Sequence, residues 1–249
     1  MDKIFYAVLV IAVTLGLAYV GYTTYTQKVE LEALQRLYST VDQITSYSQE
    51  VETSLMVSDR SIHVVGHYRN DTIESYFASF ATTTLTIPDA EPFVFSLSNV
   101  VAKDLMRFRL SHVSGSLLSA APMSDTWYEF PTDSIPAEYQ GIAVPGPISD
   151  SLALFRDGGS ALTLLKSITE ETSFTEPLTR FDYALAPQNG SEATHVRAVR
   201  ERLMGEGVIS LWTDPGVTSV RYIVLSGTDY HSTTTIKSVN VPTPSEPVE

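Results

Sequence analysis

The sequence predicts an α+β protein in which an N-terminal transmembrane helix precedes a curved antiparallel sheet, a half-barrel packed on helices. Three observations lead to this fold class. An uncharged apolar run lies near the N-terminus, a helical apolar stripe follows it, and two-residue alternation dominates the rest of the chain. We expect four regions: a transmembrane anchor at 1–27, an amphipathic helix continuing from it at 28–56, a single domain at 57–242 and a disordered tail at 243–249.

The apolar run from Ile4 to Tyr22 carries no charge. As a helix rising 1.5 Å per residue it spans roughly 28 Å, close to the thickness of the hydrocarbon core of a bilayer. A cleaved signal peptide is the alternative, but no small-residue cleavage site follows the run. The absence of cysteine and the sequons at Asn70 and Asn189 favour a cytoplasmic N-terminus and an extracytoplasmic C-terminal domain. We therefore predict a single-pass membrane protein.

The second segment predicts a helix that reaches Met56, because no proline precedes Pro88 and no glycine occurs between Gly21 and Gly66. Its apolar residues recur at spacings of three, four and seven. This stripe either packs on the protein's own sheet or forms a seam with other chains. The Leu31–Leu55 helix is thus a candidate contact for a homo-oligomer or a membrane complex. The stripe consists of Val29, Leu31, Leu34, Leu37, Val41, Ile44, Val51 and Leu55.

After Ser58 the apolar period changes from helical to two residues, which predicts a meander of antiparallel strands. Turns are expected at Asn70-Asp71, Pro88-Asp89 and Lys103-Asp104, and a hairpin turn at 214–216. The proline- and glycine-rich middle, 122–159, reads as a long ordered loop or lid. Strands are expected at 61–68, 72–87, 93–101, 105–113, 179–186, 208–212, 218–225 and 233–241, and helices at 161–168 and 192–204.

Charge and composition exclude several classes of function. There are 29 acidic and 16 basic residues, a formal net charge of −13, which opposes binding to nucleic acid. Without cysteine, thiolate metal sites and thiol nucleophiles are excluded. His63 and His67 fall on a predicted strand, where four residues separate them by about 13 Å, too far to share a metal. We find no catalytic constellation, and expect no enzymatic activity, metal or cofactor.

The sequence carries more large aromatic residues than a sheet with one buried and one solvent-exposed face needs. They either fill an ordinary core or line an apolar cavity between the sheet and the helices. For the second case, the residues expected to line the concave side and bind a ligand are Phe77, Phe93, Phe95, Phe108 and Trp127.

The order of these segments resembles a known family over roughly residues 30 to 242. A leading helix and long strands precede Trp127-Tyr128, and SALTLLKSITEETSF, TRFDYALAP, GVISLWTD, VRYIVLS and a strand ending in VNVP follow. This arrangement resembles the lipoprotein-carrier fold of LolA-like periplasmic carriers and LppX-like lipoproteins. The resemblance implies an incomplete β-barrel that wraps around helices and shelters an acyl chain. The chain departs from that family in having no lipobox cysteine and in its predicted membrane span.

We therefore expect a membrane-anchored extracytoplasmic domain that binds a lipid or another hydrophobic ligand without catalysis. Its partners would be the lipid bilayer and a lipid or acyl chain. The alternative is a structural surface or filament subunit, or an accessory subunit of a membrane complex. The long N-terminal helix is similar to that of type IV pilin-like subunits, although Ile4 to Tyr22 contains no glutamate. A stripe covered by the protein's own sheet favours ligand binding, and a bare stripe favours a filament.

Overall fold

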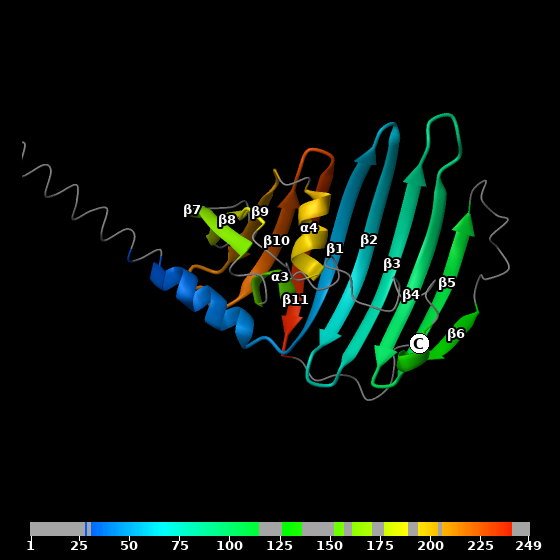
Figure 1. Ribbon diagram of the computed structural model, residues 1–249, viewed down its shortest axis with the longest axis horizontal. Coiled ribbons are helices and arrows are strands. Elements are labelled where there is room, and N and C mark those ends of the chain that lie inside the picture. Colours follow the sequence, from blue (N-terminus) through cyan, green and yellow to red (C-terminus); the bar gives the residue numbers. More distant parts are fainter. Residues whose placement is uncertain are drawn as a thin grey trace, which may run out of the picture.

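A computed structural model describes residues 28, 31–114, 126–135, 152–156, 161–170, 177–188, 194–203 and 206–240. Within this part of the chain, eleven strands form one antiparallel sheet in the order β6-β5-β4-β3-β2-β1-β11-β10-β9-β8-β7 (Figure 1). The sheet is open, with β6 and β7 at its two ends. The predicted antiparallel sheet is thus confirmed.

The sheet consists of two meanders that meet where β1 pairs with β11. The strands of the first meander are β1 (Ser46–Val57), β2 (Arg60–Asp71), β3 (Tyr76–Thr86), β4 (Phe93–Ala102), β5 (Leu105–Ser114) and β6 (Trp127–Pro131). Those of the second are β7 (Leu162–Glu170), β8 (Leu178–Leu185), β9 (Val208–Thr213), β10 (Val220–Ser226) and β11 (Tyr230–Val239). The described helices are short: η2 (Thr132–Ser134), α3 (Ala153–Arg156), α4 (Thr194–Arg202) and a leading helix over residues 31–42.

The predicted helix from residue 28 to Met56 is wrong beyond Asp42, because β1 begins at Ser46. In β1 the buried residues alternate with more exposed ones, and Val51 and Thr53 are buried whereas Glu52 and Ser54 are exposed. This period of two belongs to a strand with one covered face. Val51 and Leu55 matched the helical stripe only through their spacing of four, which a strand also places on one face. β1 therefore lies within the sheet, as its central strand beside β11.

The predicted helix at 161–168 is also wrong, because Leu162 begins strand β7. Leu162 is buried, whereas Leu165, three residues later, is 57% exposed. The pairing of β7 with β8 shifts register between Leu164 and Lys166, so this strand contains a bulge. A bulge inserts one extra residue and interrupts the two-residue alternation. The resulting spacing of three between leucines imitates a helix.

The other described elements agree with the sequence within a few residues. The predicted strands from 61 to 113 correspond to β2–β5, and those from 179 onward to β8–β11. The predicted helix at 192–204 contains α4. Asn70 and Asp71 end β2 instead of forming a turn, but the Asp71 carboxylate accepts hydrogen bonds from the backbone amides of Ile73 and Glu74, at 3.1 Å each, and so stabilises the turn that follows.

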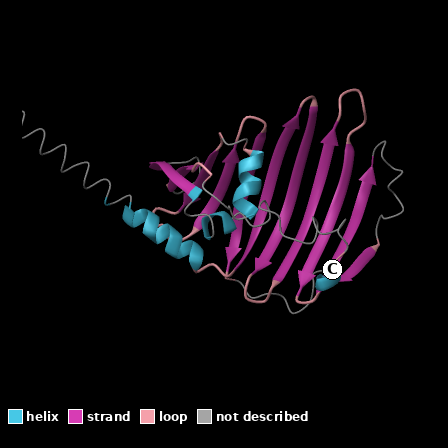
Figure 2. Cartoon of the chain, in the orientation of Figure 1, coloured by secondary structure: helices cyan, strands magenta, loops and turns pink. Residues whose placement is uncertain are grey.

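The leading helix, α3 and α4 pack on one face of the sheet and form the main core with it. The leading helix contributes Leu37 and Val41. We call the face of the sheet on which these helices pack the helix-bearing face. Figures 1 and 2 show α3 and α4 in front of β10, β11 and β1, whereas β2 to β4 have no described helix in front of them. Other members of this core are Phe155 from α3, Val196, Val199 and Leu203 around α4, and Tyr47, Phe181, Tyr183, Ile209, Leu211 and Ile223 from the strands.

Several predictions concern residues outside the described part. The expected anchor at Ile4–Tyr22, the tail at 243–249 and most of the middle region 122–159 lie there. Of the helices that the structure describes, none has the length and hydropathy needed to cross a membrane. The division of the chain into anchor, domain and tail stays a prediction.

Candidate ligand-binding surface

An apolar surface lies on the helix-bearing face beside the main core. Because directly paired residues point to the same side of a sheet, the strand register identifies its members. One row of paired residues runs from the core residue Ile223 across the sheet. That row is Ile223, Thr234, Val51, Gly66, Ala81, Leu97 and Leu110.

Two further rows place more apolar side chains on the same face. Val64 of β2 and Phe95 of β4 pair with the same residue of the intervening strand β3. Ile62 of β2 and Phe93 of β4 are related in the same way. We call the resulting set the apolar band. It comprises Ile62, Val64, Ala81, Leu85, Phe93, Phe95, Leu97 and Leu110.

Every residue of the apolar band is only partly buried, in contrast to the main core. The rings of Phe93 and Phe95 lie 5.5 Å apart between their centres. Leu97 also packs against a smaller core around Met106 and Phe108 at the β5–β6 end. A partly exposed apolar surface of this kind is typical of a site that another apolar molecule covers.

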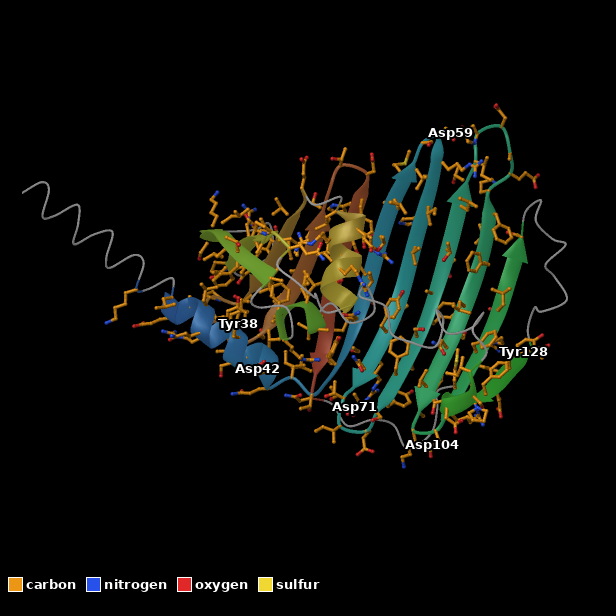
Figure 3. The ribbon with its side chains drawn as sticks, in the orientation of Figure 1. Tyr38, Asp42, Asp59, Asp71, Asp104 and Tyr128 are labelled. Carbon is orange, nitrogen blue, oxygen red and sulfur yellow. The ribbon has the colours of Figure 1, made fainter. Side chains whose placement is uncertain are left out.

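The smaller core bounds the apolar band at the β5–β6 end of the sheet. Met106 is fully buried and Phe108 is 4% exposed. The Phe108 ring stacks against Tyr128 and Phe130, with ring centres 5.3 and 6.0 Å apart. Figure 3 places Tyr128 on β6, near the end of the sheet opposite to the leading helix with Tyr38. Met106 and Phe108 are thus covered, whereas Tyr128 and Phe130 are only partly buried.

The structure brings four of the five predicted site residues to one face. Phe93 and Phe95 belong to the apolar band, whereas Phe77 and Phe108 lie on the same face but are buried, at 5% and 4% exposure. Trp127 lies on the opposite face, where it pairs with Arg109, whose guanidinium is 4.9 Å from the indole centre. Its position was not predictable, because β6 lies in the segment read as a loop.

A polar row borders the apolar band, and sequence reasoning missed it. Gln49, Tyr68, Ser79 and Asn99 are consecutive cross-strand neighbours on the helix-bearing face. Gln49 and Asn99 are buried, and the Tyr68 ring leans over Gly66, where an added Cβ would lie 2.5 Å from Tyr68 Cε2. A glycine in mid-strand was the available signal, because it often marks a close approach of another group.

The opposite face of the sheet is largely polar over β1 and β2. His63 lies 3.1 Å from Glu52, and His67 lies 3.5 Å from Glu50. Lys237 also binds Glu50, at 2.7 Å. The two histidines therefore lie on a strand, as predicted, and contact different carboxylates. Within the described residues, no three histidines or carboxylates gather as metal ligands.

A groove lies between the leading helix and the β9–β10 turn. This groove of about 470 Å³ is lined by residues that include Glu32, Gln35 and Arg36. The Thr40 hydroxyl donates a hydrogen bond of 2.8 Å to the carbonyl of Val217 and so ties the helix to the turn.

No family model matches the sequence, and no curated relative matches it either. Among solved structures, LprF from Mycobacterium bovis is similar with a TM-score of 0.48 and 13% identity, over 86% of this chain and 95% of that one. The Mycobacterium tuberculosis lipoprotein LppX is similar with a TM-score of 0.44 and 12% identity, over 87% and 97%. A β-barrel-like protein from Brucella abortus is similar with a TM-score of 0.32 and 8% identity, over 79% and 98%.

The sequence resemblance to LppX-like lipoproteins and these structural similarities name the same kind of protein. The low identities limit this likeness to the course of the chain, and no binding residue is transferred from these proteins.

Proposed function

We propose that this protein binds a lipid or another hydrophobic molecule on the apolar band, and that it does so without catalysis. The observation that carries the proposal is the partly exposed apolar band, which continues from the core across β2 to β5. Transfer of an acyl chain from water gains about 0.8 kcal/mol per CH₂, so a 14-carbon chain gains roughly 11 kcal/mol before ordering costs.

The leading helix favours this proposal over a filament subunit. Its apolar stripe is covered by the protein's own core, with Leu37 and Val41 fully buried and Ile44 only 5% exposed. Leu31 alone among the large apolar residues at 31–44 is mostly exposed, at 56%. The stripe is thus already occupied, and little of it is left as a seam for another chain.

We further propose that Ile4–Tyr22 anchors the domain beside a membrane, with the N-terminus cytoplasmic and the domain extracytoplasmic. The support is the length of the uncharged run and the sequons described above. An anchored domain would take up a ligand from the adjacent bilayer instead of diffusing with it. Intact mass of the purified chain tests the anchor, since a mature N-terminus after the apolar run would contradict it.

Native mass spectrometry of the full chain released from nonionic micelles tests the binding function. The wild-type chain should retain a lipid-sized mass, and Phe95→Asp should lose it, because a carboxylate opposes burial of an acyl chain. Phe80→Asp is the matched control, because Phe80 lies on the neighbouring strand but on the opposite face and is already 43% exposed. Loss of the mass in both variants, or in neither, would contradict the proposal.

A further inference from the structure

A cationic group lies beside the apolar band, at the C-terminal end of α4. Arg202 ends α4, and its guanidinium carbon lies 5.8 Å from the centre of the Tyr230 ring. Tyr230 begins β11 and pairs with Leu55 of β1, which pairs in turn with Ile62 of the apolar band. The β11–β1 pairing thus brings Tyr230 and Arg202 to the border between the main core and the band.

Tyr230 has an unmatched polar atom at this border. The residue is 2% exposed, and its hydroxyl has no hydrogen-bond partner among the described residues. Most buried hydroxyls are hydrogen-bonded, because leaving water without a new partner costs free energy. An acceptor supplied by a ligand would satisfy this hydroxyl.

Arg202 is exposed, and within the described part of the chain it forms no ion pair. The Tyr68 ring leans over Gly66, and so toward the end of β2 that carries Ile62. Burial raises the pKa of Tyr68, proximity to Tyr230 raises it further, and Arg202 lowers it. The two phenols and the guanidinium therefore lie within electrostatic reach of one another, and the raised pKa keeps the Tyr68 phenol a neutral hydrogen-bond donor at neutral pH.

We propose that the ligand of the apolar band carries an anionic head, a carboxylate or phosphate, which Arg202 binds and the hydroxyls of Tyr230 and Tyr68 contact. This inference rests on the proposed function and adds a class of ligand to it. A guanidinium matches the planar geometry of a carboxylate, and charge-assisted hydrogen bonds from phenols to an oxyanion are strong. In a chain of net charge −13, an arginine that forms no ion pair with another described residue and lies beside an apolar surface selects for a negative head.

The structural alternative is that Arg202 only complements the negative end of the α4 dipole and packs on Tyr230. Photolabelling of the full chain in nonionic micelles distinguishes the two. The probes are palmitate and hexadecanol, each with the same photoreactive diazirine group on its alkyl chain. The experiment is done at about pH 8, where carboxylic acids are ionised. The readout is the labelling of peptides from β2 to β4, quantified by mass spectrometry.

We expect palmitate to label these peptides at roughly 10-fold lower concentration than hexadecanol. Arg202→Gln and Tyr230→Phe should reduce this preference and leave hexadecanol labelling intact. Arg197→Gln is the matched control, an exposed arginine on the same helix, and should keep the preference. Excess acetate should not compete, because a free carboxylate lacks the chain.

Equal labelling by the two probes, or an unchanged preference for palmitate in Arg202→Gln, would contradict the proposal that the ligand has an anionic head. Neither result would contradict the binding of an apolar chain. Competition by acetate would assign the site to a free small anion and would also contradict the proposal of an anionic head. Absence of labelling by either probe would contradict the proposed function itself.

Discussion

The Asn240 side chain forms hydrogen bonds with the segment that joins the leading helix to strand β1. Its side-chain oxygen accepts a hydrogen bond of 2.9 Å from the backbone amide of Thr45, and its side-chain amide donates one of 3.2 Å to the carbonyl of Gln43. Arg156 adds a hydrogen bond of 2.7 Å to the carbonyl of Ile44. Asn240 has a φ of 52°, a left-handed conformation that asparagine tolerates better than most residues. The residue after β11 therefore fixes where β1 begins.

Asn240→Ala should lower the free energy of unfolding by about 2 kcal/mol, because it removes the side-chain hydrogen bonds to Gln43 and Thr45 and because alanine tolerates the left-handed conformation less well than asparagine. Asn240→Gly separates these causes, since it removes the hydrogen bonds but tolerates the φ angle. Urea unfolding of the full chain provides the measurement. Equal stability of the alanine variant and wild type would contradict the structural role of Asn240.

The contacts of Asn240 explain why the sequence misplaces the start of the sheet, although it predicts β2–β5. Met106 and Phe108 alternate with arginines in β5, so the local pattern alone identifies that strand. In 43–56, by contrast, Val51 and Leu55 fit both a helix and a strand. The choice between them depends on Asn240, which is distant in sequence, and on β11 as a partner.

Leu37→Ala should destabilise the fold by about 2–5 kcal/mol, because Leu37 is fully buried in the main core and its truncation leaves a cavity. Leu31→Ala, on the same helix at 56% exposure, should change stability by less than about 0.5 kcal/mol. Thermal unfolding of both variants tests whether the leading helix packs on its own domain. A small effect at Leu37 would restore the interpretation of the helix as a seam between chains.

Gly66→Ala should lower stability by about 1–3 kcal/mol, since its new methyl group would meet the Tyr68 ring at 2.5 Å. The Tyr68→Ala background removes the obstacle, so the same change should be nearly neutral there. This double-mutant cycle, measured by urea unfolding, isolates the contact between the two residues. Additive effects would show that the Tyr68 ring does not lie over Gly66 in solution.

The β9–β10 turn should confer a pH dependence on stability through Asp214. Burial alone would raise the pKa of Asp214, but hydrogen bonds from Thr218 and Ser219 outweigh burial and lower it below the ordinary value of 3.8. These bonds include one of 2.7 Å from the Thr218 amide and one of 2.6 Å from its hydroxyl. A carboxyl whose pKa is lower in the folded state stabilises the fold above the unfolded pKa.

The free energy of unfolding of wild type should therefore exceed that of Asp214→Asn, and the margin should be largest at neutral pH. That margin should shrink as the pH falls below 3.8 and reach its minimum once Asp214 is protonated in the folded state. Urea unfolding of both chains across this range provides the test. A margin that does not depend on pH would show that the ionised carboxylate contributes nothing to the turn.

The candidate site was predictable only in part. Alternation in β4 places Phe93 and Phe95 on one side, and their apolar character marks a covered face. The sequence does not show that Tyr230 and Arg202 lie beside them, because the β1–β11 pairing and the packing of α4 create that proximity. Nor does it assign Trp127 to the opposite face, since that requires the register of β6 against β5.

The most direct test of ligand binding on the helix-bearing face uses a photoreactive p-benzoylphenylalanine in place of Phe95, with the same replacement of Phe80 as the control. The full chain is extracted from the cells that produce it in nonionic detergent, irradiated and analysed by mass spectrometry. Position 95 should form a covalent lipid adduct and position 80 should not, because only Phe95 belongs to the apolar band. Adducts of equal yield at both positions, or an adduct at position 80 alone, would contradict a ligand site on this face.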